Sequence, residues 1–143
     1  MSTYEGGVGS RREARRRALE LLYEAEAKGC GVAEVLAGLP LAPEPFAAEL
    51  ATGVDAHRAE LDELLGRFSR DWPVPRMPAV DRAVLRMGAF ELAHRPDVPT
   101  AAAISEAVEL AKTYSTEESG RFVNGVLSAV AGEVRGGGGG GAC

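Results

Sequence analysis

The sequence has little of several features that identify common classes of protein. No uninterrupted apolar run approaches the roughly 20 residues that a membrane-spanning helix needs. Residues 1–9 have neither an apolar core nor a cleavage-site pattern, so we expect no signal peptide. The two cysteines, Cys30 and Cys143, cannot form a disulfide framework. These absences predict a cytoplasmic protein without a membrane segment.

The usual signatures of catalysis and metal binding are also missing. There is no glycine-rich phosphate loop, no nucleophile elbow and no pair of cysteine and histidine at useful spacing. The two histidines, His57 and His94, lie far apart in the sequence without a cysteine or carboxylate at ligand spacing. We therefore expect no enzyme activity, no metal site and no cofactor.

What is present is the composition of an ordinary globular domain. The chain has 143 residues, of which 45% are hydrophobic and 26% charged. This length suits one domain. Three of the 18 glycines lie in residues 1–9, and a run of six occupies 136–141. Because polyglycine buries nothing and loses much entropy on ordering, we predict a flexible leader at 1–9, one helical domain at 10–134 and a disordered tail at 135–143.

Helical periodicity dominates between these ends. A capping-box pattern predicts a first helix from Ser10, and Gly29 should end it. Further helices are predicted at 32–39, at 46–68 with a break near Gly53, at 80–94, at 100–114 and from a second capping box at 115–118. Three prolines within 73–78 predict the main internal hinge. The predicted fold class is all-α, with about seven helices in two packed sub-bundles.

Charge is unevenly distributed. The chain carries a net charge of −5, which argues against a generic nucleic-acid-binding protein. However, residues 11–17 hold five arginines and one glutamate, a local charge of +4, so the remainder carries −9. Cations in the first turn of a helix oppose its dipole and cost roughly 0.3–1 kcal/mol each. Their position therefore indicates a function other than helix stability.

A helical projection shows which of these arginines share one side of the predicted helix. Arg12, Arg16, Leu19 and Tyr23 fall on one side, and Arg15 lies beside them; we call Arg12, Arg15, Arg16 and Tyr23 the arginine edge. Arg17 instead lies near Glu13 and Glu20, at spacings that favour ion pairs. Guanidinium groups bind phosphates and stack on bases, and aromatic rings stack on unpaired bases. The arginine edge therefore suggests RNA binding; the alternative is a solvated helix face with a partly buried tyrosine.

Other candidate residues lie further along the chain. Asp81, Arg82 and Arg86 form a thin polar stripe on an otherwise apolar helix, where pairing with a carboxylate inside the fold is the favoured reading. Phe68 and Arg70, just before the proline-rich segment, could extend a surface for stacking and phosphate binding. The spacing of the last helix favours a core position for its aromatic residue, Phe122.

Several motifs follow one another along the chain. They are RREAR at 11–15 leading into Leu21, Leu22 and Tyr23, DRAVLRM at 81–87, VP at 98–99, AISEAVELAK at 103–112 and FVNGVL at 122–127. In order and spacing these motifs resemble the NusB family of bacterial transcription antitermination factors, and the resemblance covers about residues 10–131. The stretch at 30–75 matches only loosely.

The resemblance implies an all-helical protein that binds boxA RNA in nascent transcripts, notably ribosomal RNA leaders, together with the ribosomal protein NusE. Family members act on the RNA polymerase elongation complex with other Nus factors. The positions that match the family's RNA-contacting residues are Arg11, Arg12, Arg15, Tyr23, Phe68, Arg70, Arg86, Glu118 and Phe122. Arg16 and Arg17 extend the basic run beyond the family pattern, and we include Arg16 among the predicted RNA contacts.

The NusE surface can be placed only coarsely, on the helix at 80–94 and the loop before it, which makes Asp81 and Arg82 candidate partner contacts. Two other readings stay open from the residues. The arginine edge could meet an acidic protein partner, in an adaptor without direct RNA binding. The first helix could also form a homodimer that hides its arginines.

Overall fold

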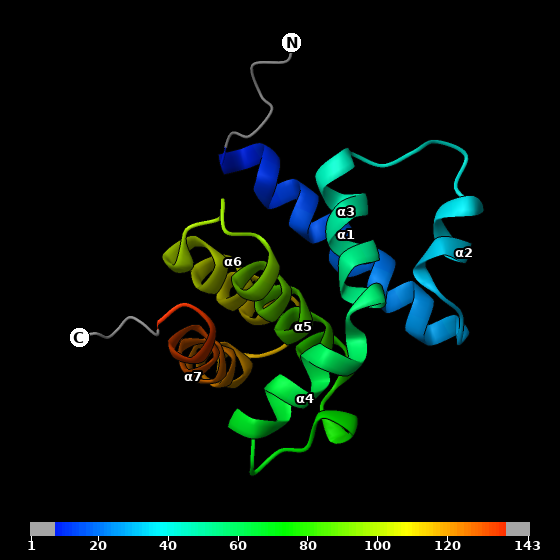
Figure 1. Cartoon of the computed structure of the whole chain (residues 1–143). Coiled ribbons are helices and arrows are strands. Elements are labelled where there is room, and N and C mark those ends of the chain that lie inside the picture. Colours follow the sequence, from blue (N-terminus) through cyan, green and yellow to red (C-terminus); the bar gives the residue numbers. More distant parts are fainter. Residues whose placement is uncertain (1–7, 137–143) are drawn as a thin grey trace. The chain divides into compact units, whose positions relative to one another are not determined.

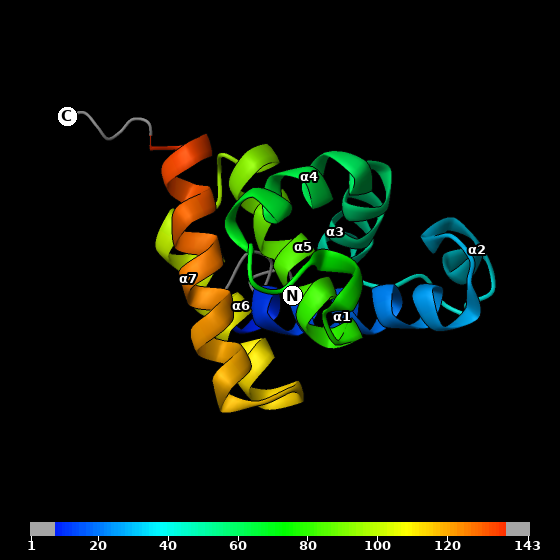
Figure 2. The same cartoon turned by 90° about the horizontal axis from the view of Figure 1, so that it is seen from below.

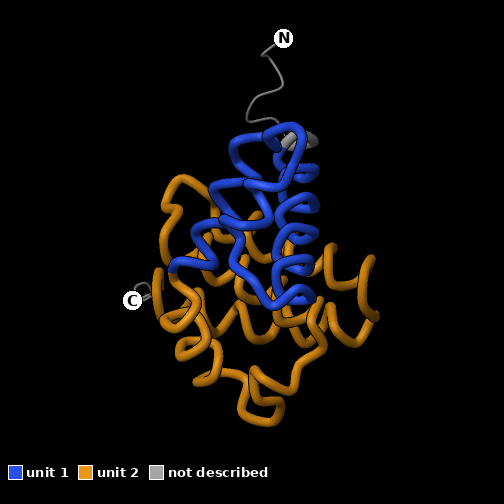
Figure 3. The backbone as a smooth tube through the Cα atoms, turned by 90° about the vertical axis from the view of Figure 1, so that its right-hand side faces the viewer, with its two compact units in different colours: residues 1–56 blue, residues 57–143 orange. Residues whose placement is uncertain are grey.

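The computed structural model describes residues 8–136, and within that range it contains seven α-helices, one short 3-10 turn and no strand (Figure 1). The predicted all-α class is confirmed. The chain divides into two compact units, residues 1–56 and 57–143 (Figure 3). No helix in the described range is both long enough and apolar enough to cross a membrane.

The first unit is built on one long helix. Helix α1 (Val8–Lys28) packs against α2 (Val32–Ala37) and α3 (Pro45–Ala56). Gly29 ends α1 with a positive φ of 69°, a conformation that costs glycine no steric strain. Glu44 caps α3, because its carboxylate accepts hydrogen bonds from the backbone amides of Phe46 and Ala47. The buried apolar residues of this unit include Ala14, Ala18, Leu21, Ala25, Val32, Val35, Leu50 and Val54.

The second unit is arranged around a buried helix. Helix α5 (Ala79–His94) contacts α4 (Arg58–Phe68), α6 (Thr100–Tyr114) and α7 (Glu117–Val134), and α6 and α7 run side by side (Figures 1 and 2). The 3-10 turn η2 (Val74–Arg76) precedes α5. At Gly88, a Cβ atom would overlap a methyl group of the buried Leu127, so glycine allows α5 and α7 to approach closely. The apolar stripe of α7 completes this core with Val123, Val126, Leu127 and Val130.

Some predicted boundaries are correct and others differ. Helix α6 spans 100–114 as predicted, and Gly29 ends α1. Helix α1 begins at Val8, so Ser10 lies inside the helix and not at its cap. The break in 46–68 comes at His57 instead of Gly53. The last helix is capped by Thr116, whose side chain accepts a hydrogen bond from the Ser119 amide, one residue later than predicted.

Two predictions about domain organisation also need correction. The proline-rich segment at 73–78 forms the turn before α5, and the boundary between the units lies instead at residues 56 and 57. Arg135, assigned from the sequence to a disordered tail, is hydrogen-bonded to α5 and to the segment after it. The rest of the leader and tail predictions, at residues 1–7 and 137–143, fall outside the described residues.

Candidate nucleic-acid interface

The outer side of α1 carries an exposed cation and an exposed aromatic ring. Arg12 is exposed, and Tyr23 has 50% of its surface exposed. Tyr23 is eleven positions after Arg12, which is about three helical turns, so both side chains lie on the same side of α1 and about 16 Å apart along its axis. This spacing offers a phosphate-binding group and a base-stacking ring on one rigid element.

Two of the predicted RNA-contacting arginines pack on an aromatic ring inside the first unit. The guanidinium carbon of Arg11 lies 4.0 Å from the centroid of the Phe46 ring, and that of Arg15 lies 5.5 Å from it. Arg15 is only 6% exposed, and Arg11 is half-buried. Cation–π contacts of this kind are worth about 0.5–2 kcal/mol. Arg11 and Arg15 therefore help to hold α1 against α3, and the surface of the arginine edge consists mainly of Arg12, Arg16 and Tyr23.

Arg16 lies in a network of ion pairs that was predicted for Arg17 alone. Its guanidinium binds Glu13 at 2.8 Å and Glu20 at 2.5 Å, and Arg17 binds Glu20 at 2.9 Å. Arg16 is three residues after Glu13 and four before Glu20, so helical geometry favours both pairs. Each exposed pair of this kind contributes only about 0.3–0.5 kcal/mol. A phosphate could therefore compete for Arg16 at small cost.

The second unit carries another aromatic group near predicted RNA contacts. Trp72 and Phe122 meet edge to face, with ring centroids 5.0 Å apart, and both rings are half-buried. Phe122, expected in the core, thus keeps part of its ring accessible. Trp72 was not predicted as a site residue, although it is the chain's single tryptophan and follows Arg70 closely in the sequence.

The remaining predicted contacts near this aromatic group differ in exposure. Phe68 is half-buried at the end of α4, and Arg70 is exposed in the loop that follows. Glu118 is exposed in the first turn of α7 and lies 3.4 Å from the guanidinium of Arg121. Arg70 therefore offers an accessible cation near Trp72 in sequence, whereas Glu118 offers an acidic group that would repel phosphate.

Arg86 is engaged inside the fold. Its guanidinium makes two parallel hydrogen bonds to the carboxylate of Asp62, at 2.7 and 2.8 Å, and the Arg86 side chain is only 12% exposed. Paired bonds of this kind fix both orientation and distance. The structure thus matches the reading from the residues, in which this arginine pairs with a carboxylate of the fold and joins α4 to α5.

Asp81 is buried and fully engaged. It is 0% exposed, and its two carboxylate oxygens accept hydrogen bonds from the hydroxyls of Ser115 and Ser119, each at 2.6 Å. These contacts tie the start of α5 to the start of α7. Asp81 therefore has a structural role and offers no surface to a partner.

Arg82 holds the turn before α5. Its guanidinium donates to the carbonyl oxygens of Met77 at 2.6 Å and Val74 at 3.2 Å. These bonds hold the backbone of the turn η2 against the first turn of α5. Arg82 thus shapes the loop that we assigned to partner binding. The exposed residues of its proline-rich part, 73–78, are Pro73, Pro75, Arg76 and Pro78.

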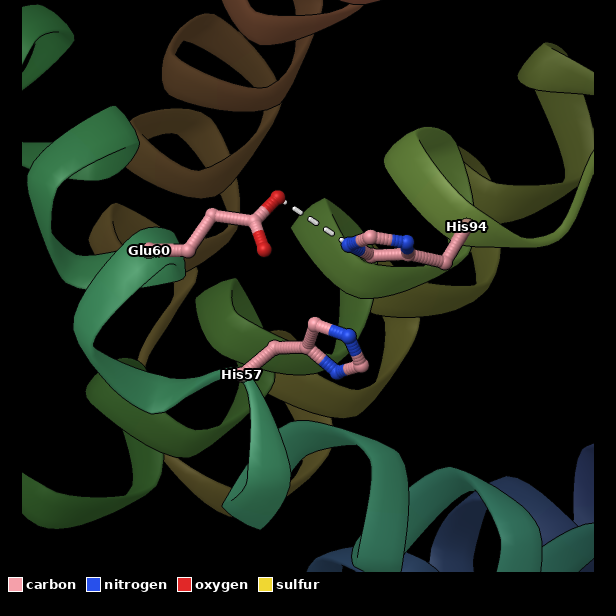
Figure 4. Close-up of side chains that lie close together, drawn as sticks. All are labelled: His57, Glu60 and His94. Carbon is pink, nitrogen blue, oxygen red and sulfur yellow. Dashed lines mark hydrogen bonds and ion pairs between the residues drawn. The ribbon is translucent and has the colours of Figure 1, made fainter.

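The two histidines, expected to lie apart, come together. His57 at the start of α4 and His94 at the end of α5 have ring centroids 4.2 Å apart, and Glu60 lies beside them (Figure 4). Their separation in the sequence concealed this contact, which forms only when α4 packs on α5. The distance between the histidines in the sequence is therefore no argument against a site that both share.

Comparison with known proteins agrees with these observations. A family model described as the NusB family matches residues 12–132. The transcription antitermination protein NusB of Thermobifida fusca is 51% identical over 124 residues, which cover 84% of this chain and 87% of the relative. The T. maritima NusB crystal structure superposes with a TM-score of 0.78 at 32% identity, covering 86% of this chain and 91% of that one. A crystal structure of NusB and NusE in complex with double-stranded RNA superposes with a TM-score of 0.75 at 27% identity, covering 88% of this chain and 98% of that one.

Proposed function

This chain belongs to the NusB family, and we propose that it is a non-catalytic transcription antitermination factor that binds boxA RNA of nascent transcripts together with NusE. The observation that carries the proposal is the placement of exposed Arg12 and Tyr23 on one side of α1. A guanidinium and an aromatic ring at this spacing can bind a phosphate and a base of one unpaired strand.

The charge distribution supports a restricted RNA site. Outside residues 11–17 the chain carries a net charge of −9, which disfavours contact between RNA and most of its surface. Arg16 can supply a second phosphate contact by exchanging an exposed carboxylate partner for a phosphate oxygen. Such a small basic area favours modest affinity for RNA by the free protein and higher affinity when a partner shares the RNA.

We propose a second RNA contact at Trp72 and Phe122, the half-buried aromatic pair of the second unit. A base stacked on an accessible aromatic face gains about 1–3 kcal/mol. Arg70 is the cation that would accompany this stacking. Arg86 contributes indirectly, because its bonds to Asp62 hold α4 against α5.

We place NusE on the loop before α5. The solved complex of a relative with NusE and double-stranded RNA supports NusE as a partner. Because Asp81 is buried and Arg82 is bonded to backbone carbonyls, the direct contacts fall on Pro75, Arg76 and Pro78, which are exposed. RNA polymerase and other Nus factors would join this assembly on the nascent transcript.

The test compares the affinity of labelled boxA RNA with that of a scrambled RNA, with and without NusE. Arg12→Ala is expected to weaken boxA binding by about 1–2 kcal/mol, a factor of roughly 5–30, because it removes one charge-assisted contact. The matched control is Lys28→Ala, which removes one exposed cation from the same helix about 24 Å away. That control should leave boxA affinity unchanged.

Salt dependence provides a second readout. Loss of one phosphate contact to a single strand should reduce the slope of log affinity against log salt by about 0.7 for Arg12→Ala alone. Equal effects of Arg12→Ala and Lys28→Ala would refute the site. If the wild-type chain binds NusE but never distinguishes boxA from scrambled RNA, the protein is an adaptor without direct RNA recognition.

A further inference from the structure

Three potential metal ligands meet between α4 and α5, and none of them is used in the proposed RNA contacts. They are His57 at the cap of α4, Glu60 in its first turn and His94 at the last position of α5 (Figure 4). We propose that these side chains form a Zn²⁺-binding site with two imidazole nitrogens and one carboxylate oxygen as ligands.

The distances are close to those a tetrahedral ion requires. All three ligand atoms lie within 4.8 Å of one another, and Nε2 of His94 is 3.0 Å from Oε2 of Glu60. Zinc binds nitrogen and oxygen at about 2.0–2.2 Å, so two ligands of a tetrahedral ion lie about 3.3–3.5 Å apart. Glu60 and His94 are thus near the required spacing already, and His57 lies within 4.8 Å of both, close enough for a side-chain rotation to complete the set.

The backbone holds the ligands in place while leaving the site accessible. The carbonyl oxygen of His57 accepts a hydrogen bond from the Leu61 amide at 2.9 Å, which fixes the start of α4. Behind the histidines lies the buried ring of Phe90, with centroids 5.6 Å from His57 and 5.3 Å from His94. Glu60 is exposed and the two histidines are half-buried, so an ion can enter from solvent.

The chemistry of the ligand set selects the class of ion. Imidazole nitrogens favour zinc and its neighbours among the transition metals, whereas magnesium and calcium prefer oxygen ligands. The last turn of α5 also presents the partial negative charge of its carbonyls, which favours a cation at His94. Three protein ligands leave one position of the ion for water. Bound zinc would therefore join the start of α4 to the end of α5.

The test uses the full, untagged chain with ZnCl₂ as the only ligand, in calorimetric titration and thermal unfolding. We expect saturable binding and a melting temperature that rises with zinc concentration, because an ion bound only by the folded state stabilises it. Mg²⁺ at the same concentration should give neither effect. Glu60→Gln and His94→Ala should each weaken zinc binding by about tenfold or more. Substituting residues that only hydrogen-bond to metal ligands already lowers metal affinity by about this factor, and here a ligand itself is removed.

The matched control is Glu63→Gln, which changes an exposed carboxylate on the same helix and should bind zinc as the wild-type chain does. Glu60 is itself exposed, so Glu60→Gln tests the ligand without disturbing the core.

The absorption spectrum of the chain with Co²⁺ in place of Zn²⁺ reports which atoms bind the ion. We expect a spectrum without the charge-transfer band of a thiolate. That band, or equal zinc affinity in Glu60→Gln, His94→Ala and the wild-type chain, would overturn the proposal. These outcomes do not depend on RNA binding.

Discussion

Arg135 is predicted to be a main stabilising residue of the second unit, although it follows the last helix. Its guanidinium donates five hydrogen bonds that connect the end of α7 to the end of α5, to the turn after it and to the first residue of α6. The acceptors are the carbonyl oxygens of Glu91, Leu92, Arg95 and Val98 and the hydroxyl of Thr100, at 2.7–3.1 Å. The backbone amide of Arg135 also closes α7 on Ala131.

The size of the effect follows from these contacts. Hydrogen bonds to a charged group are worth about 1.5–3 kcal/mol each, but bonds that share one side chain are not additive, and water reaches some freed carbonyls. We therefore expect Arg135→Ala to lower the free energy of unfolding by about 2–4 kcal/mol. Arg135→Lys should recover only part of this loss, because an ammonium group cannot span five acceptors in a fork.

Equilibrium unfolding in urea, followed by circular dichroism, measures this difference. The control is Arg121→Ala on the same helix, where the guanidinium is exposed and its nearest carboxylate oxygen, on Glu118, is 3.4 Å away. That substitution should change the free energy of unfolding by no more than about 0.5 kcal/mol. A loss below about 1 kcal/mol for Arg135→Ala, or one equal to that of Arg121→Ala, would refute the role assigned to Arg135.

Two further predictions test packing and pairing in the second unit. Gly66→Ala should stabilise the protein by up to about 1 kcal/mol, because a Cβ atom at this position meets open space. The Gly88→Ala protein should be less stable than the Gly66→Ala protein by about 1–3 kcal/mol, because the new Cβ atom overlaps the side chain of Leu127. Urea unfolding of both variants measures that gap, and equal stabilities would contradict the close approach. Double-mutant cycles of Arg86→Ala and Asp62→Ala should give a coupling energy of about 1–3 kcal/mol in stability. Weaker RNA binding by Arg86→Ala with unchanged stability would instead make this arginine a direct contact.

Local signals in the sequence were sufficient to predict most helices. The apolar periodicity at 100–114 predicts α6 with correct bounds, and Gly29 marks the end of α1 because its positive φ is a local requirement. The exact cap of α7 does not follow from the local sequence, because Ser115 and Thr116 are both good cap residues and only tertiary contacts decide between them. In the structure the Ser115 hydroxyl binds buried Asp81, which leaves the cap to Thr116.

Contacts between distant segments could not be predicted in this way. Nothing near Arg135 in the sequence indicates that its partners lie more than 30 residues earlier, so its glycine-rich neighbours suggested a tail. The meeting of His57 with His94 likewise requires α4 to pack on α5. Within α1, the helical projection placed Tyr23 on the outer surface correctly, but it put Leu19 on the same side, and Leu19 is buried. It also could not show that Arg15 packs towards Phe46.

The central claim, that boxA RNA binds along the outer side of α1, is tested most directly by photo-crosslinking boxA RNA to the full chain and mapping the attached nucleotides by mass spectrometry. The account predicts crosslinks within residues 11–23, with Tyr23 among the crosslinked residues. An excess of scrambled RNA should not remove these crosslinks, and Arg12→Ala should reduce their yield. Crosslinks specific to boxA that map only outside α1, with Arg12→Ala behaving as the wild-type chain does, would contradict it.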